Sequence, residues 1–315
     1  MIASGGSYYK VMNGNVGSVI KEYDRPYISG HVTDGSSTFT FKINNSTDIT
    51  VPVNSDGNFK WYVNTSITSL QNAFNEKHNI SVIELYGLKD VTSLYNMFRG
   101  ATSVDYNLEK VIFKNFDFSK ITTEYNVFVR RRGLKSLIGF DSMKHSSNIN
   151  LNSTFQQCYS LEFGNDFKWE NVVHENITDL TNCFYDVRSL NNKKIDCSKA
   201  STAKLQGTFF NCYVEDVYLP ITNVDTNITS IFEGAQNLRN IYAQTIFKDI
   251  NIRWSQRLTK QSILNIINAA AANVTYTLHS TVYNKCASGG EWYTDVQAAI
   301  DAKALEGYTV TLISA

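Results

Sequence analysis

The sequence predicts an α/β repeat protein: an irregular leucine-rich-repeat solenoid with a small N-terminal β cap and a C-terminal α/β cap. Three observations lead to this prediction. A short motif ending in phenylalanine recurs along the chain, strand-like runs follow it, and the composition is rich in Asn, Ser, Thr, Tyr and Phe. The 315 residues are 43% hydrophobic with a net charge of zero, which suits a globular protein with a real core.

The repeat becomes visible when the chain is aligned on seven phenylalanines, which lie roughly 23 to 30 residues apart. The motifs are Leu70–Phe74, Leu94–Phe98, Glu124–Phe128, Leu151–Phe155, Leu180–Phe184, Leu205–Phe209 and Ile228–Phe232. We expect the seven rings to form one continuous buried ladder. Threonines stand shortly before several motifs, and we expect their hydroxyls to cap short helical turns. These threonines are Thr68, Thr92, Thr122 and Thr178.

Small or sulfur-bearing residues follow the phenylalanines by three positions at Ala101, Cys158, Cys212 and Ala235. We expect these residues to be buried beside the ladder, because free cysteine behaves as a small hydrophobe. The chain has five cysteines and no C-x-x-C pair, which disfavours both a zinc site and a disulfide framework. The cysteines are therefore predicted to be reduced and unreactive.

Strand-like runs follow each motif, and alternation should turn every second side chain inward. The residues expected to point inward are Leu85, Val111, Phe113, Leu137, Ile195, Val217, Leu219 and Ile241. The residues between them form the predicted ligand-binding face, one exposed sheet surface made of Glu84, Tyr86, Lys110, Ile112, Ser136, Ile138, Lys194, Asp196, Asp216, Tyr218, Asn240 and Tyr242. Its tyrosines suit a sugar ring and a protein interface equally well.

The segment Val111–Phe128 resembles the BspA-like leucine-rich repeat, and looser copies extend the resemblance over about residues 67–245. Three features depart from the pattern: Glu124 at an apolar position, Ile149 at a threonine position, and the insert Gly164–Glu175. The resemblance implies a binding protein of the kind found in phage tail and fibre proteins and in bacterial surface adhesins.

The predicted organisation has four parts. Residues 1–25 form an attachment arm, 26–66 a small β domain, 67–257 the BspA-like repeats, and 258–315 a C-terminal α/β capping unit with a helix at 295–304. The arm either binds another protein or packs on its own domain. Its substantial apolar side chains, the candidate attachment residues, are Tyr8, Tyr9, Val11, Val16, Val19 and Ile20.

No catalytic, metal-binding or cofactor-binding residues are predicted. The five histidines are scattered and form no H-E-x-x-H or similar spacing, and no phosphate loop or nucleophile elbow is present. A carboxylate pair such as Glu84 with an acid on a neighbouring strand remains the minor alternative. Asp117, Asp141 and Asp196 are interpreted as turn residues that bond their own backbone. The cluster Arg130–Arg132 is interpreted as a solvated loop, with contact to an acidic partner as the alternative.

The resulting hypothesis is a non-enzymatic phage virion or fibre protein located in the virion. Its expected partners are other virion or fibre proteins, bound through the arm, and a host-surface glycan or protein; a homo-oligomer is left open. Nucleic acid and membrane insertion are not expected, because the charge is balanced and the apolar runs are short. No signal peptide is visible at the start. The alternatives are a bacterial cell-surface adhesin lacking its leader and, less favoured, a glycan depolymerase.

Overall fold

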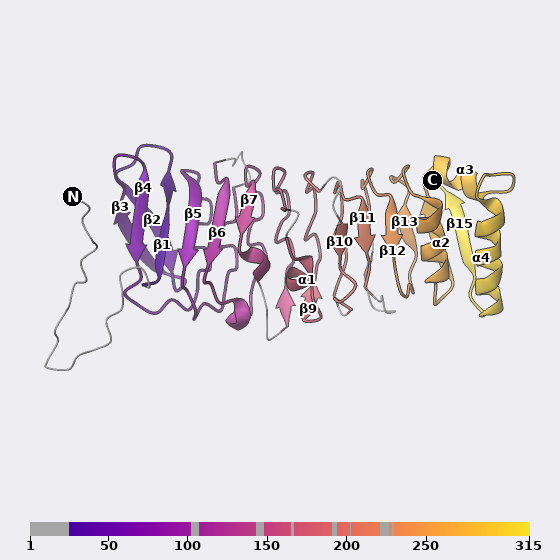
Figure 1. Cartoon of the computed structure of the whole chain (residues 1–315), viewed down its shortest axis with the longest axis horizontal. Coiled ribbons are helices and arrows are strands. Elements are labelled where there is room, and N and C mark those ends of the chain that lie inside the picture. Colours follow the sequence, from indigo (N-terminus) through magenta and orange to yellow (C-terminus); the bar gives the residue numbers. More distant parts are fainter. Residues whose placement is uncertain are drawn as a thin grey trace, which may run out of the picture.

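The computed structural model describes residues 25–101, 107–142, 148–164, 167–190, 194–201, 203–220, 227–228 and 230–315. The attachment arm predicted at 1–25 therefore lies outside the described residues, except for Arg25. The same holds for the candidate attachment residues Tyr8, Tyr9, Val11, Val16, Val19 and Ile20. The strands follow one another along the long axis of the molecule, and the longest helices stand at the C-terminal end (Figure 1).

The N-terminal part contains a five-stranded sheet in the order β4-β1-β5-β6-β7. Strand β1 pairs antiparallel with β4 and β5, whereas β5, β6 and β7 are parallel. The strands are β1 (Tyr27–Val32), β4 (Asn58–Tyr62), β5 (Ile80–Tyr86), β6 (Lys110–Lys114) and β7 (Ser136–Ile138). A separate antiparallel hairpin consists of β2 (Thr38–Ile43) and β3 (Thr47–Pro52). Strand β1 thus joins the N-terminal β unit directly to the first repeats.

Three further sheets follow, each with parallel neighbours. They contain β8 (Ile149–Asn150) with β9 (Ile177–Asp179); β10 (Lys194–Asp196), β11 (Asp216–Tyr218) and β12 (Asn240–Tyr242); and β13 (Ile250–Ile252), β14 (Val274–Leu278) and β15 (Val310–Ser314). The helices are η2 (Phe118–Lys120), η3 (Phe140–Ser142), α1 (Trp169–Val172), α2 (Lys260–Asn268), α3 (Ser280–Cys286) and α4 (Tyr293–Leu305). The helix predicted at 295–304 corresponds to α4.

The predicted fold class is wrong. The described strands divide among five separate sheets, so the chain is not one continuous α/β leucine-rich-repeat solenoid. Helix is also scarce: between Tyr27 and Ile252, the described residues contain a single α-helix, the four-residue α1. The repeating units therefore do not each supply a helix opposite a strand.

The backbone conformation two residues before each ladder phenylalanine explains why the units lack helices. All seven residues there have a left-handed φ, between 51° and 61°: Asn72, Asn96, Asn126, Ser153, Asn182, Gly207 and Ser230. Asparagine and glycine tolerate this region best, and it interrupts right-handed helical hydrogen bonding. The N–H groups of Phe74, Phe98 and Phe128 accordingly donate to carbonyls of the following unit at 2.8 to 3.0 Å.

The phenylalanine ladder is confirmed. Phe74, Phe98, Phe128, Phe155, Phe184, Phe209 and Phe232 are each 0% exposed. Successive rings stack with centroids 5.1 to 5.9 Å apart and planes within 14°. Phe41 of the hairpin continues the stack, with its centroid 5.4 Å from that of Phe74. The ladder is the centre of one hydrophobic core that runs from the hairpin to the C-terminal helices.

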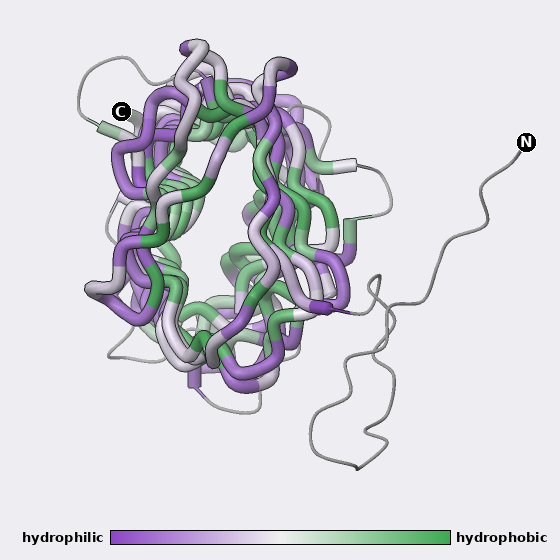
Figure 2. The backbone as a smooth tube through the Cα atoms, turned by 90° about the vertical axis from the view of Figure 1, so that its left-hand side faces the viewer, coloured by the Kyte–Doolittle hydropathy of each residue, from purple (hydrophilic) through white to green (hydrophobic). Residues whose placement is uncertain are grey.

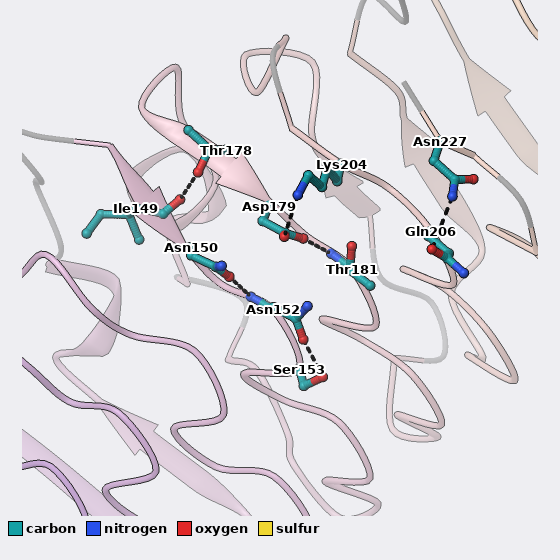
Figure 3. A network of polar contacts seen from close by, with 10 residues as sticks. All are labelled: Ile149, Asn150, Asn152, Ser153, Thr178, Asp179, Thr181, Lys204, Gln206 and Asn227. Atoms are coloured by element: carbon teal, nitrogen blue, oxygen red, sulfur yellow. Dashed lines mark hydrogen bonds and ion pairs between the residues drawn. The ribbon is translucent and has the colours of Figure 1, made fainter. Parts of the chain in front are cut away.

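The threonines before the motifs do not cap helices. The hydroxyls of Thr92, Thr122 and Thr178 donate to the backbone carbonyls of Thr68, Thr92 and Ile149, each in the preceding unit. Other polar side chains near these threonines contact neighbouring residues or the next unit, and Figure 3 shows one such network. In it Asp179 accepts from the Thr181 N–H at 2.8 Å and lies 3.8 Å from the Lys204 ammonium. Polar contacts therefore link the units where helical caps were predicted.

The side chain of Arg131 is 0% exposed, so the interpretation of Arg130–Arg132 as a solvated loop is wrong at its central residue. Its guanidinium donates to the carbonyls of Phe74, Lys77 and Phe98. A planar guanidinium with five N–H donors can serve several carbonyls at once. Arg131 thus ties together backbone of the two preceding units, and it is not available to an acidic partner.

The cysteines are buried, as predicted, and all five are free. Cys158 and Cys212 occupy matching positions three residues after their phenylalanines, and both are fully buried. Removal from water raises the pKa of the Cys158 thiol, and raises the pKa of the Cys212 thiol to about 12. These thiols are therefore protonated at neutral pH and act as small apolar groups.

Candidate ligand-binding face

The predicted inward strand residues are buried, between 0% and 9% exposed, so the predicted alternation is correct. Hydrophobic and hydrophilic residues also alternate along the backbone in the view down the long axis (Figure 2). The twelve outward residues, however, are divided between two sheets. Glu84, Tyr86, Lys110, Ile112, Ser136 and Ile138 lie on the five-stranded sheet; Lys194, Asp196, Asp216, Tyr218, Asn240 and Tyr242 lie on the β10–β12 sheet. The β8–β9 sheet comes between these two sheets in the chain order.

Register determines which residues of the first group are neighbours. Glu84 is level with Ile112, and Ile112 is level with Ile138; Lys110 is level with Ser136. On its other side, Glu84 is level with Ser29 of β1. No carboxylate therefore occupies the strand positions flanking Glu84, and the pair imagined for a glycan depolymerase is not formed at these positions. The neighbouring strands supply a hydroxyl and an apolar side chain instead.

Strands β1 and β4 add side chains that the sequence prediction missed. They complete a line of basic and aromatic residues across the five-stranded sheet, which we call the cationic tyrosine row: Arg25, Tyr62, Lys60, Tyr27, Tyr86 and Lys114. Lys114 was predictable from the sequence, because it is the next outward position after Ile112. Tyr27 and Lys60 were not, because nothing in the sequence indicates that β1 lies between β4 and β5.

The rings of the row stand against one another. Tyr27 stacks on Tyr86 with centroids 4.9 Å apart and planes at 11°, and Tyr62 meets Tyr27 edge-on at 6.3 Å. The Lys60 ammonium lies 3.8 Å from the Tyr27 centroid, and the Lys114 ammonium lies 5.7 Å from that of Tyr86. Since the strand order is β4-β1-β5-β6, the two lysines lie on opposite sides of the tyrosine pair. The ring faces are thus occupied within the protein.

A short hydrogen bond fixes the centre of the row. The Tyr27 hydroxyl donates to Glu84 Oε1 at 2.5 Å. Loss of hydration at the hydroxyl, followed by its bond to Glu84, raises the pKa of Tyr27 to about 12. Tyr27 therefore stays protonated at neutral pH and remains a donor. Beside this bond, Ser29, His31, Asn58, Lys60 and Glu84 help to line a shallow hollow.

The second group repeats part of this arrangement. Tyr218 stacks on Tyr242 with centroids 4.2 Å apart, and the Lys194 ammonium lies 3.9 Å from the Tyr218 centroid. Asn240 donates to Asp216 at 2.7 Å. Because Asp196 is level with Tyr218 in the register, this cluster carries two acids beside its single lysine. It is consequently more acidic than the row.

Other chemistry has little support among the residues with a described structure. Within these ranges, no group of three or more His, Cys, Asp and Glu side chains is placed to hold a metal ion. The carboxylates of Asp117 and Asp196 accept from backbone N–H groups two residues ahead, as predicted for turn residues. Asp141 instead accepts from Lys168 N–H in the next unit. None of the described helices is both long and apolar enough to cross a bilayer.

The arrangement defines a β-rich repeat protein with an outward row of tyrosines and cations. Comparison with protein families gives three overlapping matches, over residues 40–163, 68–198 and 106–223, to the family described as Mycoplasma protein of unknown function, DUF285. These matches span more than half of the chain, which belongs to this family. The resemblance to BspA-like repeats is confirmed at the level of this BspA-like surface-protein family. No curated protein and no solved structure matches the chain.

Proposed function

We propose that the chain is a non-enzymatic binding protein displayed on a biological surface, with the cationic tyrosine row as its contact site. The observation that carries this proposal is the row itself. It combines tyrosine hydroxyls, the neighbouring amides of Asn58 and Asn115, and exposed ammonium groups on the solvent side of a sheet whose other side is packed on the core. Such a surface recognises a ligand without any group placed for bond cleavage.

Family membership supports display on a surface and favours one of the two sequence-based hypotheses. The description of the family names Mycoplasma proteins, so its members include bacterial proteins. This favours a bacterial cell-surface adhesin over a phage virion or fibre protein. The virion hypothesis, including attachment through the arm to other virion proteins, stays a prediction.

The test is a binding screen with the full chain on an array of host-surface glycans and proteins. One variant, Tyr86→Ser with Lys114→Gln, removes part of the row. A matched control, Tyr242→Ser with Lys194→Gln, makes the same exchanges in the second cluster. We expect the row variant to lose the ligands that the wild type and the control retain.

Two outcomes would contradict the proposal. One is that the wild type retains no ligand of any class. The other is that it shortens a retained polysaccharide, measured as new reducing ends over time, which would make the chain an enzyme.

A further inference from the structure

We infer that the cationic tyrosine row binds an acidic polysaccharide, laid across the strands with its anionic groups on Arg25, Lys60 and Lys114. This inference rests on the proposed function and names the ligand class of the same site. It is carried by three properties of the row: its uncompensated charge, its covered ring faces and its linear shape.

The charge of the row is not balanced within the described structure. Arg25, Lys60 and Lys114 form no ion pair with any described acid, and Glu84 accepts from the neutral Tyr27 hydroxyl. Two exposed lysines elsewhere in the same half of the chain are each paired with an acid. Lys120 lies 2.6 Å from Asp90, and Lys135 lies 2.9 Å from Glu109. An anionic ligand would neutralise the cations of this row, as acidic side chains neutralise lysines elsewhere.

The aromatic faces of the row are already covered, which argues against two other ligand classes. A neutral sugar or a nucleic-acid base would need a free ring face for stacking. Tyr27 is enclosed between Lys60 and Tyr86, and Tyr86 between Tyr27 and Lys114. What the row presents outward is ring edges, hydroxyls and ammonium groups.

The shape of the row fits an extended polymer. It crosses four adjacent strands in the order β4, β1, β5 and β6. With neighbouring strands about 4.8 Å apart, it spans about 14 Å. A small anion could contact one cation at a time, whereas a polymer with repeated carboxylate or sulfate groups can contact all of them. The hydroxyls of such a polymer can form hydrogen bonds with polar side chains on either side of the row, such as Ser29, Asn58 and Asn115.

The experiment measures the affinity of the full chain for four soluble probes by interferometry at several salt concentrations. The probes are a sulfated heparin oligosaccharide, poly-glutamate and single-stranded DNA of similar charge, and neutral dextran. We expect the heparin oligosaccharide to bind most tightly. Because each lost lysine contact lowers the salt dependence, Lys60→Gln with Lys114→Gln should weaken binding at least tenfold and reduce the slope of log K against log salt by about 2.

The matched control is Lys120→Gln with Lys135→Gln, which removes the same charge from two exposed lysines outside the row. It should bind like the wild type, and circular dichroism melting should show all three proteins folded. Equal loss in both variants would show attraction by net charge alone and overturn the inference. So would poly-glutamate or DNA binding as tightly as the oligosaccharide.

The same data separate this inference from the proposed function. If the chain retains only dextran or a protein on the array, and the row variants lose it, the inference fails while the proposed function stands. If the row variants bind that ligand unchanged, both fail. If no probe and no array ligand is retained, both fail.

Discussion

Replacing Arg131 with methionine should destabilise the protein by about 3 to 5 kcal/mol. The guanidinium is fully buried and donates to the carbonyl oxygens of Phe74, Lys77 and Phe98. Methionine keeps much of the side-chain volume but leaves these oxygens without their donor, and each buried acceptor left unsatisfied costs about 1 to 3 kcal/mol. Lysine should recover little of the loss, because one ammonium cannot reproduce the planar fork.

The assay is urea denaturation followed by far-UV circular dichroism, with the midpoint shift converted through the m-value. Arg130→Met is the matched control from the same run of arginines, and it should cost less than about 1 kcal/mol because its side chain reaches solvent. Equal midpoints for the two variants would refute the reasoning. The three carbonyl contacts would then contribute nothing specific to stability.

Three further predictions follow from the core. Phe155→Ala should cost about 3 to 5 kcal/mol, whereas Ile138→Ala, at a position 45% exposed, should cost less than about 1. Gly207→Ala should cost about 1 to 3 kcal/mol, because φ is +60° and the new Cβ would lie 2.4 Å from Asn182 Oδ1; a near-neutral result would contradict the strain. Burial raises the pKa of Cys212 from 9.0 to about 12. Above pH 9 the unfolded chain therefore releases a proton that the folded chain keeps, and the free energy of unfolding falls as the pH rises towards 12. Cys212→Ala should flatten the fall of melting temperature over this range, and an unchanged slope would count against a contribution from this thiol.

Local sequence determined the ladder and the alternation of the strands. A motif that ends in phenylalanine, repeated at short intervals, has few ways to bury its rings other than against one another. In the same way, an apolar residue at every second position of a strand turns Val111 and Phe113 inward and Ile112 outward. These features depend on neighbours a few residues apart, so periodicity was enough to predict them.

The left-handed turns are also encoded in the sequence, although the neighbouring threonines suggest helix caps instead. Asparagine recurs two residues before the phenylalanine at Asn72, Asn96, Asn126 and Asn182. Asparagine favours a left-handed turn over helix interior, and this signal competed with the threonines that were interpreted as caps. The left-handed backbone at these asparagines excludes a helix from each unit, which is why the predicted α/β class is wrong.

The tertiary structure alone decided the composition of the candidate site. Sequence placed Glu84 and Tyr86 on an outward face, but only the insertion of β1 between β4 and β5 brings Tyr27 and Lys60 beside them. It likewise decided that Arg131 is buried while its neighbours reach solvent. The physical reason is the long sequence separation of these contacts, which join residues 20 to 60 positions apart. Which strands pair, and which side chain is buried, depends on the backbone edges and carbonyls that remain free after the rest of the chain has packed.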